Sequence, residues 1–184
     1  MVTVRPAEVS DADRIAEIHV RTWQAAYAGA MPADVLDGLT AASFAERDRR
    51  AIERRTPPIE VFVAEADGGP DGDPVVVGFC MVGPYGLVQG QPDERAGEVY
   101  AIYAAPEHWS TGAGFALMRA GVDHLAAHGR TEVRLWVLAD NPRARRFYER
   151  FGFVADGGAR TETVGDGGPA PAVIEEVRYT LSRR

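Results

Sequence analysis

The feature that most constrains this chain is a strand–turn–helix–strand pattern in its second half. Residues 98–104 (EVYAIYA) form an apolar run that Pro106 ends, and apolar residues then recur at helical spacing over 112–128. A second apolar run, 133–138 (VRLWVL), follows the helix and is typical of a central strand. Strand, helix and strand in this order predict two parallel strands joined by a right-handed crossover.

The remaining segments extend this unit to the order β-α-α-β-β-β-α-β-α-β-β. The sequence predicts strands at 2–5, 60–66, 75–82, 153–155 and 173–181, and helices from Ser10 to about 27–29, over 42–55, and from Pro142 to Gly152. It predicts a loop at 83–96 and a mobile polar stretch between 155 and 173. We therefore expect a single α+β domain over residues 1–184, with a mixed central sheet flanked by helices.

Composition and charge narrow the classes of function. The 184 residues are 46% hydrophobic and 26% charged, as in an ordinary globular protein that builds a core without disulfides. A net charge of -7 and a pI near 5.1 argue against a nucleic-acid partner and suit a cationic substrate. The first residues lack a signal-peptide core, and no run approaches about 18 apolar residues. We expect a cytoplasmic protein without a membrane partner.

The glycine-containing turn before the second-half helix is a candidate phosphate site. Free N–H groups at a helix N-terminus attract anions, and Gly112 and Gly114 let the backbone approach such a group closely. The segment 110–115 would then hold a phosphate or pyrophosphate. An equally consistent interpretation is that these glycines only shape the turn. A dinucleotide-binding turn, with Asp140 on a ribose, is a further alternative, but Leu117 stands where its third glycine belongs.

Three residues near these elements have side chains suited to acid–base chemistry. Asn141 begins a helix, and Tyr148 lies two turns later on nearly the same side, where its hydroxyl could act as a general acid. Taken alone, this spacing is better explained by a helix start at Asn141 and an ordinary core position for Tyr148. Glu98, at the start of its predicted strand, could take a proton from an ammonium group directly or through water. The alternative for Glu98 is an exposed charge at a strand end.

Other reactive residue types carry less information. Cys80 lies in an apolar strand, which favours a core position, and the four histidines show no metal-ligand spacing, so we predict no metal. Trp23 and Tyr27 either line an acceptor pocket, where aromatic rings favour a cationic amine, or belong to the core of the first helix.

Three segments together resemble the GNAT superfamily of N-acetyltransferases. GEVYAIYAAPEHWSTGAGFALM resembles its CoA-binding motif, WVLADNPRARRFYERFGF its later Asn-x6-Tyr and Gly-Phe segment, and IHVRTWQAAYAGAMP its opening helix and loop. The resemblance implies transfer of an acetyl group from acetyl-CoA to a primary amine of a small molecule. It further implies direct attack through a tetrahedral intermediate. Alternatives are a protein N-terminal or lysine acetyltransferase, or a catalytically silent CoA-binding sensor.

The resemblance also implies roles for individual positions. Tyr148 matches the acid that protonates the leaving thiolate, and backbone N–H groups of the strand end match those that polarise the thioester carbonyl. The positions matching CoA contacts are Ile102, Tyr103 and Ala104 on the strand, Ser110, Thr111, Gly112, Ala113, Gly114 and Phe115 in the pyrophosphate loop, and Asn141.

The chain departs from the family pattern in the pyrophosphate loop. Trp109 stands where Gln or Arg is usual, and Ser110 where Gly is common. Because these contacts come mainly from backbone amides, we expect CoA binding to survive. Arg143 and Arg145 are candidates for the missing cation. An exposed C-terminal strand would allow two copies to pair as a homodimer.

Overall fold

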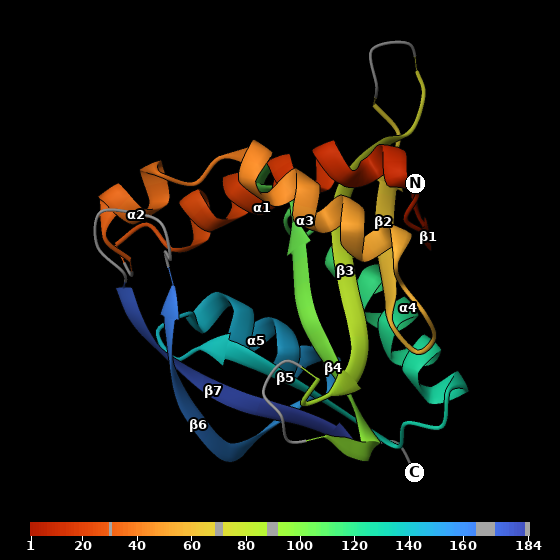
Figure 1. The fold of residues 1–184 in the computed structure, drawn as a ribbon, viewed down its shortest axis with the longest axis vertical. Coiled ribbons are helices and arrows are strands. Elements are labelled where there is room, and N and C mark those ends of the chain that lie inside the picture. The colour runs from red at the N-terminus through yellow and green to blue at the C-terminus, as the bar shows by residue number, and fades with distance from the viewer. Residues whose placement is uncertain (30, 69–71, 88–91, 165–171, 183–184) are drawn as a thin grey trace.

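A seven-stranded mixed sheet, in the order β1-β2-β3-β4-β5-β7-β6, forms the centre of the protein (Figure 1). The computed structural model describes residues 1–29, 31–68, 72–87, 92–164 and 172–182. The strands are β1 (Val2–Pro6), β2 (Glu60–Ala66), β3 (Val75–Tyr85), β4 (Asp93–Ala104), β5 (Glu132–Leu138), β6 (Val154–Val164) and β7 (Ala172–Ser182). The helices are α1 (Ala12–Ala26), α2 (Ala33–Asp37), α3 (Ala41–Glu53), α4 (Ala113–Ala127) and α5 (Pro142–Phe151). The predicted α+β order is confirmed, with α2 as an additional short helix.

The hairpin of β3 and β4 is longer than the sequence indicated. The predicted loop at 83–96 was wrong at both ends, because strand pairing continues through Gly83↔Glu98, Pro84↔Gly97 and Tyr85↔Asp93. Glu98 therefore lies inside β4, with neighbours on both sides, and not at the start of a strand.

The prediction of a mobile stretch between 155 and 173 was also wrong over its first part. Residues 154–164 form β6, which pairs with β7 from Ala159↔Val177 to Val164↔Ala172. A register shift between Ala155 and Ala159 accommodates Gly157, whose φ of 85° few other residues adopt. The rest of that stretch, 165–171, lies outside the described residues.

The C-terminal strand is an interior strand of the sheet. β7 pairs with β5 on one side and with β6 on the other, so β1 and β6 are the sheet edges. The expectation that the C-terminal strand is exposed for pairing between subunits was therefore wrong; an edge-to-edge contact on this side would use β6.

Helices cover the two faces of the sheet and define its two cores. On one face, here called the α4 face, α4 and α5 pack on a cluster that includes Leu117, Val133 and Tyr148. On the other, the α1 face, α1 and α3 pack on a cluster that includes Ile15 and Phe79. Among the described helices, none is both long and apolar enough to cross a membrane.

Candidate functional site

The parallel strands β4 and β5 diverge part-way along their length. They pair in parallel from Ala96↔Glu132 to Val99↔Leu135, which confirms the predicted parallel pair. Beyond this point β4 pairs with β3 as far as Ala104↔Gly78, and β5 pairs with β7 as far as Leu138↔Glu176. We call this divergence the splay. Beyond it, backbone N–H and carbonyl groups of β4 and β5 face each other without hydrogen bonds between the two strands in the described structure.

The predicted CoA-binding triplet lies on the open edge of β4. The Ala105 N–H donates to the Val77 carbonyl of β3 at 2.8 Å. Because backbone groups alternate in direction along a strand, those of Ile102 and Ala104 point the other way, toward the splay. The Ala104 carbonyl accepts from Trp109 Nε1 at 2.8 Å and from Thr22 Oγ1 at 3.1 Å. The N–H groups of Ile102 and Ala104 therefore face the position of a ligand in the splay.

The predicted pyrophosphate loop turns sharply before α4. Ser110 has φ 65° and Gly112 has φ 97°, both left-handed conformations, and at Ser110 this is uncommon for a residue with a side chain. The first bond of α4 runs from the Ala116 N–H to the Gly112 carbonyl at 3.0 Å. The N–H groups of residues 113–115 precede this bond and point out of the helix end, as an anion requires.

Arg143 supplies a cation beside this loop, and Arg145 does not. The Arg143 guanidinium lies 3.6 Å from the centre of the Trp109 ring and its side chain is exposed. Arg145 is held by the Tyr179 hydroxyl and the Ala139 carbonyl, each at 3.1 Å. Asn141 caps α5 as predicted, because its side-chain oxygen accepts from the Ala144 N–H at 3.0 Å.

Tyr148 is a core residue whose hydroxyl has no hydrogen-bond partner among the described residues. It is 8% exposed and packs against Tyr179 and Phe153 on the α4 face. Burial raises the pKa of Tyr148, and the nearby Tyr103 hydroxyl raises this pKa further. The side chain is therefore protonated over the physiological range, the form that a general acid needs.

Trp23 and Tyr27 surround Tyr103 on the opposite face of the sheet. The rings of Trp23 and Tyr27 lie 5.2 Å apart, and burial followed by the Tyr103 and Tyr148 hydroxyls raises the pKa of Tyr27. Burial raises the pKa of Tyr103, although the Trp23 indole N–H opposes this change. That N–H is buried and has no hydrogen-bond partner among the described groups. The two candidate acceptor residues are thus near the splay, on its α1 side. A hollow of about 400 Å³ next to them is lined by Gln24, Ala28, Gly29, Met31, Ala33, Leu36 and Asp37.

Glu98 is a buried carboxylate on the α1 face. It is 6% exposed, and its Oε2 accepts a hydrogen bond from the Gly86 N–H at 3.2 Å. Burial raises the pKa of Glu98, although the Gly86 N–H and Arg160 oppose this change. The alternative of an exposed strand-end charge is wrong, because β4 begins five residues before Glu98 and the residue is only 6% exposed.

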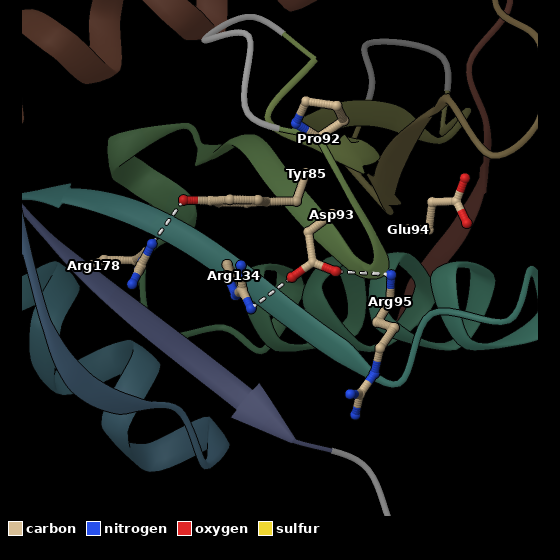
Figure 2. Close-up of a pocket in the computed structure, with 7 residues that line it drawn as sticks. All are labelled: Tyr85, Pro92, Asp93, Glu94, Arg95, Arg134 and Arg178. Atoms are coloured by element: carbon tan, nitrogen blue, oxygen red, sulfur yellow. Dashed lines mark hydrogen bonds and ion pairs between the residues drawn. The ribbon is translucent and has the colours of Figure 1, made fainter.

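The larger described hollow, of about 710 Å³, lies at the beginning of β4 (Figure 2). In Figure 2 the Tyr85 ring lies along one wall, with Arg178 on its hydroxyl at 2.8 Å and Arg134 paired with Asp93 at 2.9 Å. Asp93 precedes Ile102 by nine residues, about 30 Å of extended chain, so this hollow is separate from the splay. Its residues are Tyr85, Pro92, Asp93, Glu94, Arg95, Arg134 and Arg178.

Sequence reasoning did not identify a charged group on β6 and β7. Glu176 accepts from Arg160 at 2.6 Å, and the Arg160 guanidinium lies 4.4 Å from the centre of the Trp136 ring. The signal was the alternation of Glu176 and Arg178 with apolar residues in β7, which predicts one polar face. The prediction that the stretch between 155 and 173 is mobile concealed most of the partner strand β6.

Cys80 is buried among apolar side chains, as predicted. Burial raises the pKa of its thiol to about 12, which makes it a poor nucleophile. Among the described residues, no group of three or more His, Cys, Asp or Glu side chains is arranged to hold a metal ion.

Comparison with known proteins places these features in a family. The sequence model of the acetyltransferase (GNAT) family matches residues 13–153. N-acetyltransferase YuaI of Bacillus subtilis is 34% identical over 143 residues, which are 77% of this chain and 75% of YuaI. Mycothiol acetyltransferase of Acidimicrobium ferrooxidans is 37% identical over 99 residues, 54% of this chain and 29% of that protein. The solved PaiA N-acetyltransferase of Thermoplasma acidophilum, in complex with coenzyme A, has the same fold, with a TM-score of 0.70, 17% identity and 99% of each chain covered.

Proposed function

The chain belongs to the acetyltransferase (GNAT) family, and we propose that it transfers the acetyl group of acetyl-CoA to a primary amine of a small molecule. Two relatives carry N-acetyltransferase and mycothiol acetyltransferase in their names, and two structures of similar fold were solved with coenzyme A or acetyl-CoA. These relationships support acetyl-CoA as the donor. The choice of a small primary amine as the acceptor rests on this chain's own residues.

The observation that carries the proposal is the splay with Tyr148 beside it. The divergence after Val99 and Leu135 leaves backbone N–H groups of β4 facing β5. The Tyr148 hydroxyl lies near Tyr103, which adds to burial in raising the pKa of Tyr148. A thioester carbonyl bound to the N–H of Ile102 or Ala104 would have a proton donor near its sulfur. Such a pairing of oxyanion donor and acid is what acyl transfer needs.

The remaining part of acetyl-CoA fits the loop before α4. The N–H groups of residues 113–115 would bind the pyrophosphate, and Gly112 permits the turn that aims them outward. Arg143, held over Trp109, would supply the positive charge that the loop itself lacks. Phe115, which is 50% exposed at the start of α4, and the Asn141 side chain complete the candidate contacts.

The proposed reaction needs one proton acceptor and one proton donor. The amine loses a proton through water to Glu98, and its nitrogen then attacks the thioester carbonyl to give a tetrahedral intermediate. The C–S bond breaks as the new C–N bond is kept, and Tyr148 gives its proton to the leaving thiolate. The nitrogen releases its second proton to water as the amide forms, and water returns a proton to Tyr148. Glu98 acts through water because it is tightly enclosed within β4, before the splay begins.

A small acceptor is favoured by the aromatic side chains on the α1 side of the splay. Tyr27 and Trp23 pack beside Tyr103 there and narrow the approach to the triplet. A protein N-terminal or lysine acetyltransferase is the second candidate, since Glu176 and Arg178 give one face of β7 a row of polar side chains. A silent sensor is disfavoured by Tyr148, whose buried hydroxyl would have no purpose in a domain that only binds CoA.

Calorimetric titration of the protein with acetyl-CoA, with NADH as the control, tests the donor. We expect saturable one-to-one binding of acetyl-CoA and none of NADH. A screen of small primary amines against basic peptides, followed by CoA release, then tests the acceptor. Binding of NADH without acetyl-CoA would instead assign the glycine turn to a dinucleotide and remove the proposal.

A further inference from the structure

We propose that Glu176 binds the ammonium group of the acceptor directly, opposite the thioester carbonyl; this inference rests on the proposed acetyl transfer. Glu176 lies on β7 beside the end of β5, which borders the splay, in a position that the sequence did not single out. Four observations carry the inference: its register, the face on which it lies, its bonding to Arg160, and the unpartnered hydroxyl of Tyr148.

The register places Glu176 level with the end of β5. Glu176 pairs with Leu138, whereas Glu98 is level with Arg134. Leu138 is four residues beyond Arg134, about 13 Å along the strand. The triplet Ile102–Ala104 begins four residues beyond Glu98, so Glu176 and the triplet lie at the same level, with the end of β5 and the splay between them.

Strand alternation directs the Glu176 side chain to the α1 face. Val177 and Tyr179 pack in the core of the α4 face, so the residues between and before them point to the other side. Tyr103 also lies on the α1 face, where its ring stacks on His19 with centres 4.8 Å apart. An acceptor that reached the splay from the α1 face would therefore meet Glu176 and Tyr103.

The contacts of Glu176 hold it in place and leave one oxygen outside the ion pair. Arg160 Nε and Nη2 both contact the same atom, Oε2, at 2.6 Å. The side chain of Glu176 is only 14% exposed, and Arg160 is in turn stacked on Trp136. Glu176 is thus a restrained carboxylate whose Oε1 is free of the Arg160 contacts.

The charges around Glu176 favour a cation. Glu162 also pairs with Arg160, with 2.9 Å between Glu162 Oε2 and Arg160 Nη2. Burial raises the pKa of Glu98, and Glu176 and Glu162 lie near enough to Glu98 to raise it further. Burial raises the pKa of Glu176, with Arg160 opposing the change and Glu162 reinforcing it. Arg178 also lies over the Trp136 ring but is paired with Asp156, so the carboxylates of Glu98, Glu162 and Glu176 outnumber the Arg160 guanidinium near them. An alkylammonium group would neutralise this excess of negative charge.

The Tyr148 hydroxyl is the independent indication that a ligand completes this place. The Tyr148 residue as a whole is 8% exposed, its hydroxyl has no partner among the described residues, and burial, Tyr103 and Glu176 all raise its pKa. A polar group largely withdrawn from water is normally hydrogen-bonded. A thioester between Tyr148 and Glu176 would give the hydroxyl its partner and place the acceptor nitrogen on the Glu176 side.

The test compares Glu176→Gln with Glu175→Gln. Glu175 is the adjacent residue on the same strand, is exposed, and by alternation points to the opposite face, so its variant makes the same charge change away from the splay. The probe is butylamine, whose ammonium group needs no further pocket. The measurement is butylamine-dependent release of CoA from acetyl-CoA, with acetyl-CoA affinity measured by calorimetry and folding by thermal melting.

We expect Glu176→Gln to lower kcat/KM for butylamine by at least about tenfold, through a higher KM, with acetyl-CoA affinity unchanged. Glu175→Gln should match the wild type, and Glu176→Asp should recover part of the loss. Equal kcat/KM in the two glutamine variants, or a wild type that binds acetyl-CoA but shows no butylamine-dependent release, would overturn the role of Glu176. Failure of the wild type to bind acetyl-CoA would instead remove the acetyltransferase proposal, and this inference with it.

Discussion

The guanidinium of Arg143 stacks on the ring of Trp109, 3.6 Å from its centre, and so joins the start of α5 to the loop before α4. Trp109 is itself fixed by the bond from its Nε1 to the Ala104 carbonyl. Trp109, which departs from the family pattern, is thus the ring on which the Arg143 cation stacks. The contact positions a positive charge beside the outward-pointing N–H groups of α4.

Replacing Arg143 by Gln should weaken acetyl-CoA binding by a factor of roughly 3 to 10, because an exposed cation contributes modestly to anion binding. The loss should shrink at high salt, where exposed charges are screened. Calorimetric titration at two salt concentrations measures both effects. Arg146→Gln is the control, since it makes the same change on an exposed side chain of α5; equal effects of the two variants would exclude a specific role for Arg143.

Replacing Tyr148 by Phe should lower turnover well over tenfold and leave acetyl-CoA affinity intact, because only the proton donor is lost. Burial raises the pKa of Tyr148, so the wild-type hydroxyl should stay protonated at pH values where an ordinary tyrosine ionises. Steady-state kinetics with calorimetry measures the split. Tyr100→Phe, which removes a hydroxyl bonded to the Pro84 carbonyl, is the comparison. Unchanged turnover in Tyr148→Phe would remove Tyr148 from the acid role.

Replacing Glu98 by Gln should reduce kcat/KM mostly at low pH. A base must be ionised, and burial raises the pKa of Glu98, so wild-type activity should fall as the pH drops through that raised value. At high pH the amine is already neutral and the variant should approach the wild type. The measurement is kcat/KM for the acceptor across pH for both proteins. A uniform loss at every pH would assign Glu98 to positioning.

Replacing Asp11 by Asn should destabilise the fold by about 1–3 kcal/mol, because Asp11 is 8% exposed and accepts from Arg5 at 2.7 and 3.0 Å. Burial alone would raise the pKa of Asp11, but the Arg5 guanidinium and the Glu8 N–H outweigh it and lower the pKa. The stabilisation is therefore complete above the unfolded-state pKa and is lost as the pH falls through the folded-state value.

Urea unfolding of wild type and Asp11→Asn at neutral and acidic pH measures this contribution. The difference between the two proteins should narrow as the pH falls. Asp13→Asn is the control, because Asp13 pairs with Arg49 but is 75% exposed. A constant difference at every pH would show that Asp11 contributes by packing and not by charge.

Much of the fold could be predicted because local patterns determine local structure. The apolar period of α4, the Asn141–Pro142 start of α5 and its end at Gly152, with φ 114°, each depend on neighbours within a few residues. The family segments likewise predicted roles for Tyr148 and the triplet. The extension of β3, β4 and β6 beyond their predicted ends escaped prediction, since pairing with a partner strand outweighs glycine and polar composition.

The sequence by itself therefore determined which elements form, their order, and the family to which their motifs belong. Only the tertiary structure decided which charged residues meet at the splay. Glu98 is buried because it lies inside β4, paired with β3 and β5, and not at a strand end. Arg143 lies over Trp109 in the loop before α4, while Arg145 is held by Tyr179. Glu176 lies level with Ile102 because of the register in which β7 pairs with β5 and β5 pairs with β4. Register is fixed by hydrogen bonds and packing across the sheet, which no short stretch of sequence encodes.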